Sequence, residues 1–298
     1  MRKHLVASLF LLASLPALAT MEAALSDFKK GNYGAAIKEL NTLGDAGNVP
    51  AQIMLGALYS KGGAVPRDDK MAAAWFEKAA NQGNAEAQYQ LGNLYENSQL
   101  PKDYKAAANW YLKSAQQGSA KAQARLGMFY SNGLGVAQNP NEAILWSGKA
   151  ALQGNADAQY WFGLGYMQGK RAPKNAQLAM GWLSKAAAQN HTDALLLMAR
   201  AYQRGEGTPK DAVLAYALNT LALANKVSPT ATQRNEDLTG QLSQQQLETA
   251  NKLAAELRKP KNFSNALNTY ITKFHQPPFR FFERPEKNRR DNPANDKG

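Results

Sequence analysis

Apolar and small side chains recur along this chain with the spacing of helices. In one block Ala87, Leu91, Leu94 and Tyr95 stand at positions i, i+4, i+7 and i+8, which is one face of an α-helix. A second block, from Lys70 to Asn81, is rich in alanine and carries its aromatic residues on one side. Loops containing glycine or proline separate the two kinds of block. The pattern predicts an all-α protein built from pairs of helices.

The paired blocks repeat along the chain about every 36 residues, and four copies are clear. Each copy opens with Gly-x-x-x-Ala-Gln and closes with a lysine followed by small residues, as in Lys78-Ala79-Ala80. Each second block holds one tryptophan, at Trp75, Trp110, Trp146 and Trp182. These four share one repeat position, so we expect them in the core. A period of this length is typical of a solenoid, and solenoids mostly present an extended surface to another macromolecule.

Two sets of glycines recur with the repeat. The first set follows the second block, where a helix end favours a left-handed residue, and asparagine replaces glycine in the last copy. Its members are Gly83, Gly118, Gly154 and Asn190. The second set lies inside the first block, where glycine costs about 1 kcal/mol relative to alanine. Its members are Gly56, Gly92, Gly127 and Gly163. Glycine at that cost in every copy predicts a close approach between helices.

The combination of Leu-Gly-x-x-Tyr, a glycine-rich loop, Ala-x-x-Trp and Lys-Ala-Ala resembles the Sel-1-like repeat family of the tetratricopeptide-like superfamily. The resemblance implies a right-handed αα-solenoid with terminal capping helices. It covers five repeats, at 47–82, 83–117, 118–153, 154–189 and 190–225. Members of the family generally act as adaptors or regulators, and some bacterial members are periplasmic immunity proteins against type VI secretion phospholipase toxins.

The segments flanking the repeats are interpreted as caps and a tail. Residues 20–46 resemble a tetratricopeptide helix pair that would cover the first repeat. Residues 226–257 are interpreted as a loop and a C-terminal capping helix, which opens with the capping box Ser243-Gln-Gln-Gln246. Residues 258–298 form a basic and mostly disordered tail, in which Phe263 to Ile271 has room for one short helix.

Residues 1–19 have the features of a secretory signal peptide: basic residues, a short apolar run and small residues at Ala17 and Ala19. We expect cleavage after Ala19 and a periplasmic location for the mature protein. Secretion from the cell stays open as an alternative. The chain has no cysteine. Its net charge of +12 falls to +10 without Arg2 and Lys3, and residues 258–298 carry ten basic and four acidic residues, which is +6 of that charge. The part of the mature chain before residue 258 therefore carries only about +4, so the high net charge comes mainly from the tail.

No catalytic or metal-binding constellation stands out. After removal of the signal, His191 and His275 are the two histidines, and we interpret both as ordinary surface residues. Asp68, Asp69 and Asp103 lie in loops where aspartate caps the following helix. The sequence therefore predicts no enzyme, no cofactor and no metal, although a weak hydrolase based on carboxylates stays open as an alternative.

One surface stripe is a candidate for partner binding. Trp161 occupies a repeat position where the residue type varies between copies, and tryptophan is enriched at binding hot spots. Packing against a neighbour is an equally good interpretation of this tryptophan. In tetratricopeptide-like solenoids the first helices line the concave face, so the equivalent positions define the stripe. Its members are Met54, Gln90, Asn93, Arg125, Met128, Trp161, Leu164, Leu197 and Arg200. We expect both arginines to be available for carboxylate or carbonyl groups.

The function that this combination favours is a non-enzymatic periplasmic scaffold that binds a protein partner through its concave face. The alternatives are an immunity protein against a secreted lipase toxin, an envelope regulator and the weak hydrolase. No basic track follows the stripe, so nucleic acid is not expected as a partner. Neither stable membrane insertion nor self-association is expected, although the basic tail leaves open a loose association with an anionic membrane surface.

Overall fold

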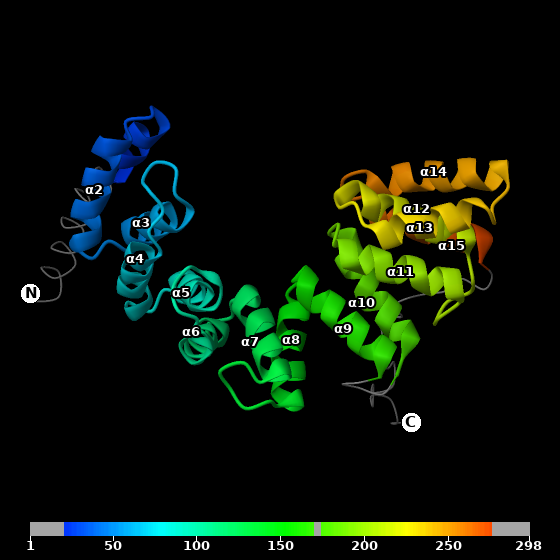
Figure 1. Ribbon diagram of the computed structural model, residues 1–298, viewed down its shortest axis with the longest axis horizontal. Helices are drawn as coiled ribbons and strands as arrows, with labels where there is room; N and C mark the ends of the chain where they lie inside the picture. The colour runs from blue at the N-terminus through cyan, green and yellow to red at the C-terminus, as the bar shows by residue number, and fades with distance from the viewer. Residues whose placement is uncertain (1–20, 170–173, 276–298) are drawn as a thin grey trace, which may run out of the picture. The chain divides into compact units, whose positions relative to one another are not determined.

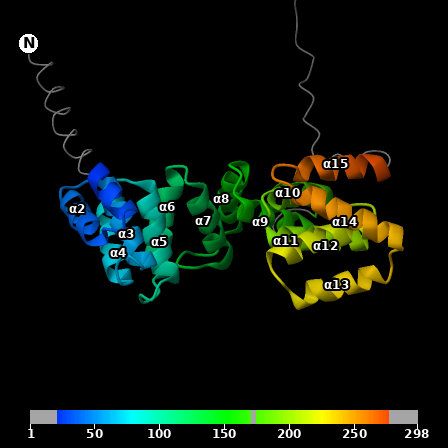
Figure 2. The same ribbon diagram turned by 90° about the horizontal axis from the view of Figure 1, so that it is seen from above.

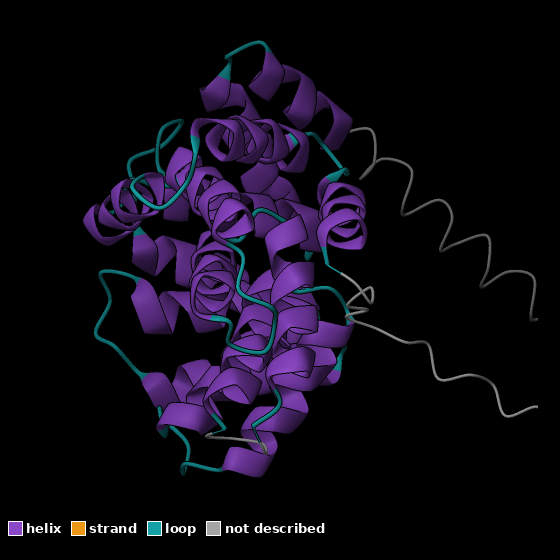
Figure 3. Cartoon of the chain, turned by 90° about the vertical axis from the view of Figure 1, so that its right-hand side faces the viewer, coloured by secondary structure: helices purple, strands orange, loops and turns teal. Residues whose placement is uncertain are grey.

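The computed structural model describes residues 21–169 and 174–275, and within these ranges every regular element is a helix (Figures 1 and 3). The predicted all-α class and the αα-solenoid are confirmed. The predicted signal peptide at 1–19 and the tail from 276 onward lie outside the described residues and stay predictions. The chain divides into two compact units, Met1–Ala150 and Ala151–Gly298, which are described one at a time.

The first unit begins with a helix at 21–29 and continues as an unbroken series of helices. The series is α2 (Tyr33–Asp45), α3 (Val49–Lys61), α4 (Asp69–Asn81), α5 (Ala85–Asn97), α6 (Tyr104–Gln116), α7 (Ala120–Asn132) and α8 (Pro140–Leu152). From α2 to α7 each helix packs against the next one in the chain. The unit boundary falls in the last turn of α8.

The second unit contains two more repeated helix pairs and three further helices. They are α9 (Ala156–Gln168), α10 (Ala176–Ala188), α11 (Thr192–Arg204), α12 (Ala212–Asn225), α13 (Pro229–Thr239), α14 (Gln244–Arg258) and α15 (Phe263–Phe274). Both α13 and α14 pack on α12, while α15 packs on α14 and returns to contact α10 (Figure 2). The last three helices therefore cover the end of the repeat stack in this unit.

The turn between successive repeats explains the recurring Gly-Asn pair. Gly83 has a φ of +88°, and its N–H donates to the Ala80 carbonyl at 3.0 Å. The Asn84 side chain then accepts from the Ala87 N–H at 2.9 Å and caps α5. The predicted left-handed positions are confirmed in the later copies as well, including Asn190 with a φ of +65°. One residue ends the helix before the turn, and its neighbour starts the helix after it.

The glycines inside the first helices lie where two helices meet closely, as predicted. A Cβ added to Gly92 would lie 2.8 Å from the Tyr111 ring and 3.2 Å from the Ala107 carbonyl oxygen of α6. A Cβ added to Gly56 would lie 2.8 Å from the Phe76 ring of α4. No side chain fits at these positions, which explains why the helix tolerates a residue of poor helix propensity.

The glutamine of the repeated Ala-Gln motif is buried and ties each first helix to the helix before it. The Gln88 amide donates to the Ala80 carbonyl at 3.1 Å, and its oxygen accepts from Gln117, at the end of α6 in the same repeat, at 2.8 Å. The corresponding donors in the other copies are Gln52, Gln123 and Gln159. A buried carbonyl at a helix end needs such a partner, so this glutamine does structural work in each of these repeats.

The recurring tryptophans pair with the lysines three residues later. The lysine ammonium lies over the indole ring at centroid distances from 3.8 Å for Lys78 and Trp75 to 4.6 Å for Lys185 and Trp182. Trp75 and Trp146 are buried, as expected for core residues, whereas Trp110 and Trp182 are only half-buried. The motif Trp-x-x-Lys is thus a cation–π pair on the second helix of each of these repeats.

The C-terminal end differs from the sequence-based expectation in two ways. The stretch interpreted as a loop contains α13, which buries Ala231 and Leu238. The folded part also continues past Arg258, because α15 buries Phe263 and Ile271 in the core of the second unit. The capping box at Ser243 is confirmed. None of the helices in the described ranges combines the length and apolarity needed to cross a membrane.

Candidate binding surface

In the first unit, the predicted stripe is mostly half-buried and its polar groups have local partners. Gln90 donates to Glu86 at 2.7 Å, and Asn93 accepts from Asn97 at 2.8 Å, each within α5. Met54 and Met128 are half-buried and pack against the hydrophobic core. This part of the stripe therefore offers few unsatisfied groups to a partner.

Arg125 is not available in the way the sequence suggested. Its guanidinium lies 3.3 Å from the carboxylate of Glu96, one repeat earlier, and contacts the Met128 sulfur at 3.9 Å. Glu96 is buried and also accepts from the Tyr111 hydroxyl at 2.7 Å. Burial raises the pKa of Tyr111, and the bond to Glu96 raises it further. Arg125 thus neutralises a buried carboxylate before it can serve a partner.

In the second unit, the stripe divides into exposed and buried members. The Trp161 side chain is 43% exposed, Leu164 is half-buried against the core, and Arg200 is half-buried. Leu197 is only 8% exposed, so the expectation that it lines an open groove is wrong. It belongs to the same buried cluster as Leu238 of α13, the helix that stands where a loop was predicted.

Trp161 contacts the ring of Tyr160, which itself stacks on His191. Tyr160 lies 5.2 Å from Trp161 and stacks on the His191 ring at 4.8 Å with an interplanar angle of 22°. His191 caps α11 by accepting from the Ala194 N–H at 3.2 Å, and its Nε2 lies 3.1 Å from Asp157. His191 is therefore a structural cap rather than the ordinary surface histidine of our prediction. Trp161 therefore contacts a tyrosine that stacks on the residue capping α11.

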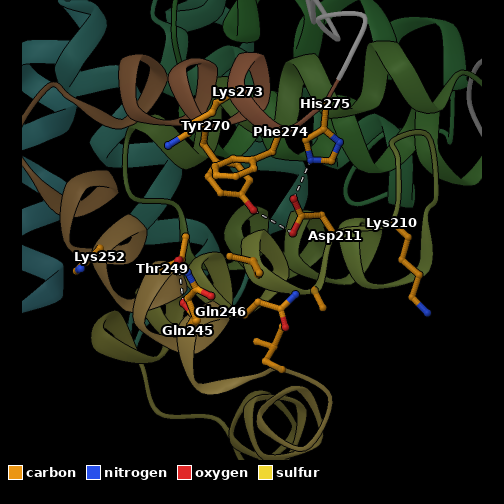
Figure 4. A pocket seen from close by; sticks show the side chains of 13 residues that line it. Lys210, Asp211, Gln245, Gln246, Thr249, Lys252, Tyr270, Lys273, Phe274 and His275 are labelled. Atoms are coloured by element: carbon orange, nitrogen blue, oxygen red, sulfur yellow. Dashed lines mark hydrogen bonds and ion pairs between the residues drawn. The ribbon is translucent and has the colours of Figure 1, made fainter.

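A pocket of about 830 Å³ in the second unit had no signal in the sequence pattern (Figure 4). It lies where α12, α14 and α15 meet, and its lining includes Lys210, Gln245, Thr249, Lys252 and Lys273. Figure 4 shows His275 and Tyr270 both pointing toward Asp211 at one side of the pocket.

Asp211 collects three hydrogen bonds at that side of the pocket. Its carboxylate caps α12 through the Leu214 N–H at 2.8 Å, lies 2.7 Å from His275 Nε2 and accepts from the Tyr270 hydroxyl at 3.3 Å. The Asp211 and His275 side chains are 9% and 10% exposed. The prediction that His275 is an ordinary surface residue is therefore wrong. We name these three side chains the Asp211 latch, because they join the start of α12 to α15.

The groups of the Asp211 latch bond to one another and to the start of α12. A histidine and an aspartate support hydrolysis when a nucleophile stands within hydrogen-bond reach of the histidine. The Thr249 hydroxyl, which also lines the pocket, donates to the Gln245 carbonyl at 2.9 Å. Burial raises the pKa of Tyr270, and the Asp211 charge raises it further, so its hydroxyl stays protonated.

The other candidate acids have structural positions. Asp68 and Asp103 cap α4 and α6, as predicted. Asp69 is not a cap: it pairs with Arg67 at 2.9 Å and accepts from the Gln99 N–H at 2.8 Å. The hydrogen bonds from Arg67 lower the pKa of Asp69. Within the described ranges no group of three histidine, cysteine, aspartate or glutamate side chains could hold a metal ion.

The stacked helix pairs define an αα-solenoid repeat protein. The Sel1 repeat model matches five segments of the chain, at 49–84, 85–119, 120–155, 156–191 and 192–223. The chain belongs to the Sel1 repeat family, and the matched repeats begin two residues later than the boundaries expected from the sequence.

Two solved structures with the same fold are at least 26% identical to this chain. A Sel1 repeat protein from Oxalobacter formigenes is 30% identical with a TM-score of 0.67, covering 78% of this chain and 96% of its own. A protective antigen of uropathogenic Escherichia coli with an SLR fold is 26% identical with a TM-score of 0.54, covering 87% of this chain and 64% of its own.

An immunity protein from Pseudomonas aeruginosa is more distant, at 20% identity and a TM-score of 0.46, covering 72% of this chain and 83% of its own. A likeness this distant does not extend to function. No curated protein matched the sequence significantly.

Proposed function

We propose that this Sel1 repeat protein is a non-enzymatic scaffold that binds another protein through the first-helix surface of its second unit. The observation that carries the proposal is the 43% exposure of Trp161. The contact surface is defined by Tyr160, Trp161, Leu164 and Arg200, and we name it the Trp161 patch.

The physical argument rests on preorganisation. An exposed tryptophan presents a large apolar area, and it loses little freedom on binding when its neighbours already hold it. The Trp161 ring contacts Tyr160, and Tyr160 stacks on the His191 cap. Exposed indole area is costly in water, and its burial by a partner is the expected source of affinity.

Trp161→Ala is expected to weaken partner binding by about 2 kcal/mol or more, which is roughly thirtyfold in affinity. The measurement is capture by the purified protein from envelope and secreted fractions, followed by calorimetry with the captured protein. Leu178→Ala is the matched control, because Leu178 is 39% exposed in the same unit but lies on the second helix α10.

A protein retained by wild type and by Leu178→Ala, but lost by Trp161→Ala, supports the proposal. Equal retention by all three contradicts it. If the captured protein is a phospholipase, an inhibition assay then tests the narrower hypothesis of an immunity protein.

We also propose that the protein works in the periplasm, on the basis of the signal-like features of residues 1–19. Expression of the complete gene in a Gram-negative host is expected to give a periplasmic product that begins at Thr20. Cell fractionation and N-terminal sequencing measure this. A product that retains Met1 and stays in the cytoplasm would refute the proposal.

A further inference from the structure

The pocket beside the Asp211 latch carries an excess of positive charge. Its lining contains three lysines, Lys210, Lys252 and Lys273, and a single acid, Asp211. The Asp211 carboxylate is already engaged, because it lies 2.7 Å from His275 Nε2. A concave surface lined mainly by charges of one sign concentrates ligands of the opposite sign. The lining therefore favours an anionic ligand.

The three lysines are not neutralised by ion pairs in the described part of the chain. None of the ion pairs formed among the described residues includes Lys210, Lys252 or Lys273. The Lys273 ammonium lies 5.1 Å from the centre of the Phe274 ring, which is an uncharged partner. All three lysines are exposed, so an anion reaches them without any opening of the fold.

The lysines lie on two opposite sides of the pocket. Figure 4 shows Lys210 on one side and both Lys252 and Lys273 on the other, with the Asp211 latch between them. They come from three elements, since Lys210 precedes α12, Lys252 lies on α14 and Lys273 lies on α15. A lysine ammonium is a compact charge on a flexible stem, so it binds carboxylate and phosphate groups alike. The arrangement suits a ligand with one anionic group for each side.

The lining also contains apolar side chains, among them Val213, Leu242 and Phe274. Phe274 is 54% exposed, and Figure 4 shows it between Lys273 and Lys210. Exposed aromatic area is unfavourable in water, and a ligand that covers this ring gains affinity from its burial. The part of a ligand that joins its two anionic groups is therefore expected to be apolar.

We propose that this pocket binds an elongated organic dianion, with an anionic group at each end and an apolar middle. One anionic group binds Lys210, the other binds Lys252 and Lys273, and the middle covers Phe274. The volume of about 830 Å³ lies in the range of roughly 300–1,000 Å³ that is typical of small-molecule sites. The pocket shares no residue with the Trp161 patch, so this site is separate from the proposed scaffold function.

Isothermal titration calorimetry of the purified protein with decanedioate tests the proposal, and decanoate is the matched probe that lacks the second carboxylate. The protein is expected to bind decanedioate at least about tenfold more tightly than decanoate. Lys210→Gln removes the charge from one side of the pocket. It is expected to lower the affinity for decanedioate about tenfold, to a value close to the affinity for decanoate.

Lys226→Gln is the control variant, because Lys226 is exposed in the same unit and does not line the pocket. It is expected to change the affinity for decanedioate by less than about threefold. Circular dichroism checks that both variants are folded. The bisphosphate ester of decanediol has the same middle, and its affinity shows whether the two sides prefer phosphate or carboxylate. Tighter binding of either dianion than of decanoate supports the proposal.

Three outcomes would overturn the proposal: no binding of either dianion, no preference for a dianion over decanoate, or equal losses in Lys210→Gln and Lys226→Gln. Inorganic sulfate provides a separate arm, because a small anion fills only a minor part of the pocket and leaves Phe274 uncovered. If sulfate binds as tightly as the dianions, the lysines form a small-anion site and the elongated ligand is wrong.

Discussion

Replacement of Gly127 by alanine is expected to destabilise the first unit by about 1–3 kcal/mol, although alanine is the better helix former. The added Cβ would overlap the Ser147 hydroxyl and would lie 2.9 Å from the Ser147 backbone nitrogen and 3.1 Å from the Ala143 carbonyl oxygen. A hydroxyl can rotate away from the new methyl group, but the backbone of α8 cannot. The two helices must therefore move apart, and their shared core loses contacts.

The matched control is Gly34→Ala in α2. Gly34 lies in a helix, and an added Cβ there would meet no atom within 4 Å. This variant is expected to gain up to about 1 kcal/mol, because alanine has the higher helix propensity. Chemical unfolding monitored by circular dichroism measures both variants. Opposite signs support the close-approach role of Gly127, whereas a gain at both positions would refute it.

The sequence correctly predicted features that depend on a few neighbouring residues or that recur in several copies of the repeat. The left-handed Gly83 and the capping box at Ser243 are each decided within a few residues, so the local pattern is sufficient. Gly92 was predicted to lie at a close contact because an unfavourable residue recurs at that position in each of four copies. Repetition within one chain thus gives information about packing that a single copy would not give.

The features that the sequence missed depend on weak periodicity or on distant partners. The α13 helix buries only Ala231 and Leu238, so its hydrophobic period is too faint to distinguish it from a polar loop. Asp211 and His275 are 64 residues apart, and no local rule connects them. Glu96 lies in the repeat that precedes Arg125. Its presence was the one signal in the sequence for the ion pair between these two residues.

The candidate binding surface was also predicted correctly at one position and wrongly at another. The varying repeat position correctly pointed to an exposed Trp161, because a residue type that changes between copies is free of the shared core. The same rule placed Leu197 at the surface, and there it failed. Leu197 belongs to the last repeat, where the additional helices α13 to α15 complete the core instead of another repeat. Terminal repeats follow different packing rules from internal ones.

Asp211→Ala is expected to destabilise the second unit by about 2–4 kcal/mol, the larger effect of two chemically matched substitutions. The substitution removes the cap of α12 and leaves the buried His275 ring and the Tyr270 hydroxyl without their acceptor. Asp103→Ala is the control, because Asp103 caps the equivalent helix α6 through the Ala106 N–H and has no histidine partner. Its expected cost is about 1 kcal/mol, the usual value of a cap.

The difference between the two substitutions measures what the Asp211 latch adds to capping. Thermal unfolding gives the stability, and hydrogen exchange locates the loss, which is expected in α15. His275→Ala provides an independent test, because it removes one arm of the latch and keeps the cap of α12 intact. It is expected to increase exchange in α15 while α12 stays protected. Equal costs for Asp211→Ala and Asp103→Ala, with α15 unchanged, would mean that apolar packing of Phe263 and Ile271 alone holds this helix.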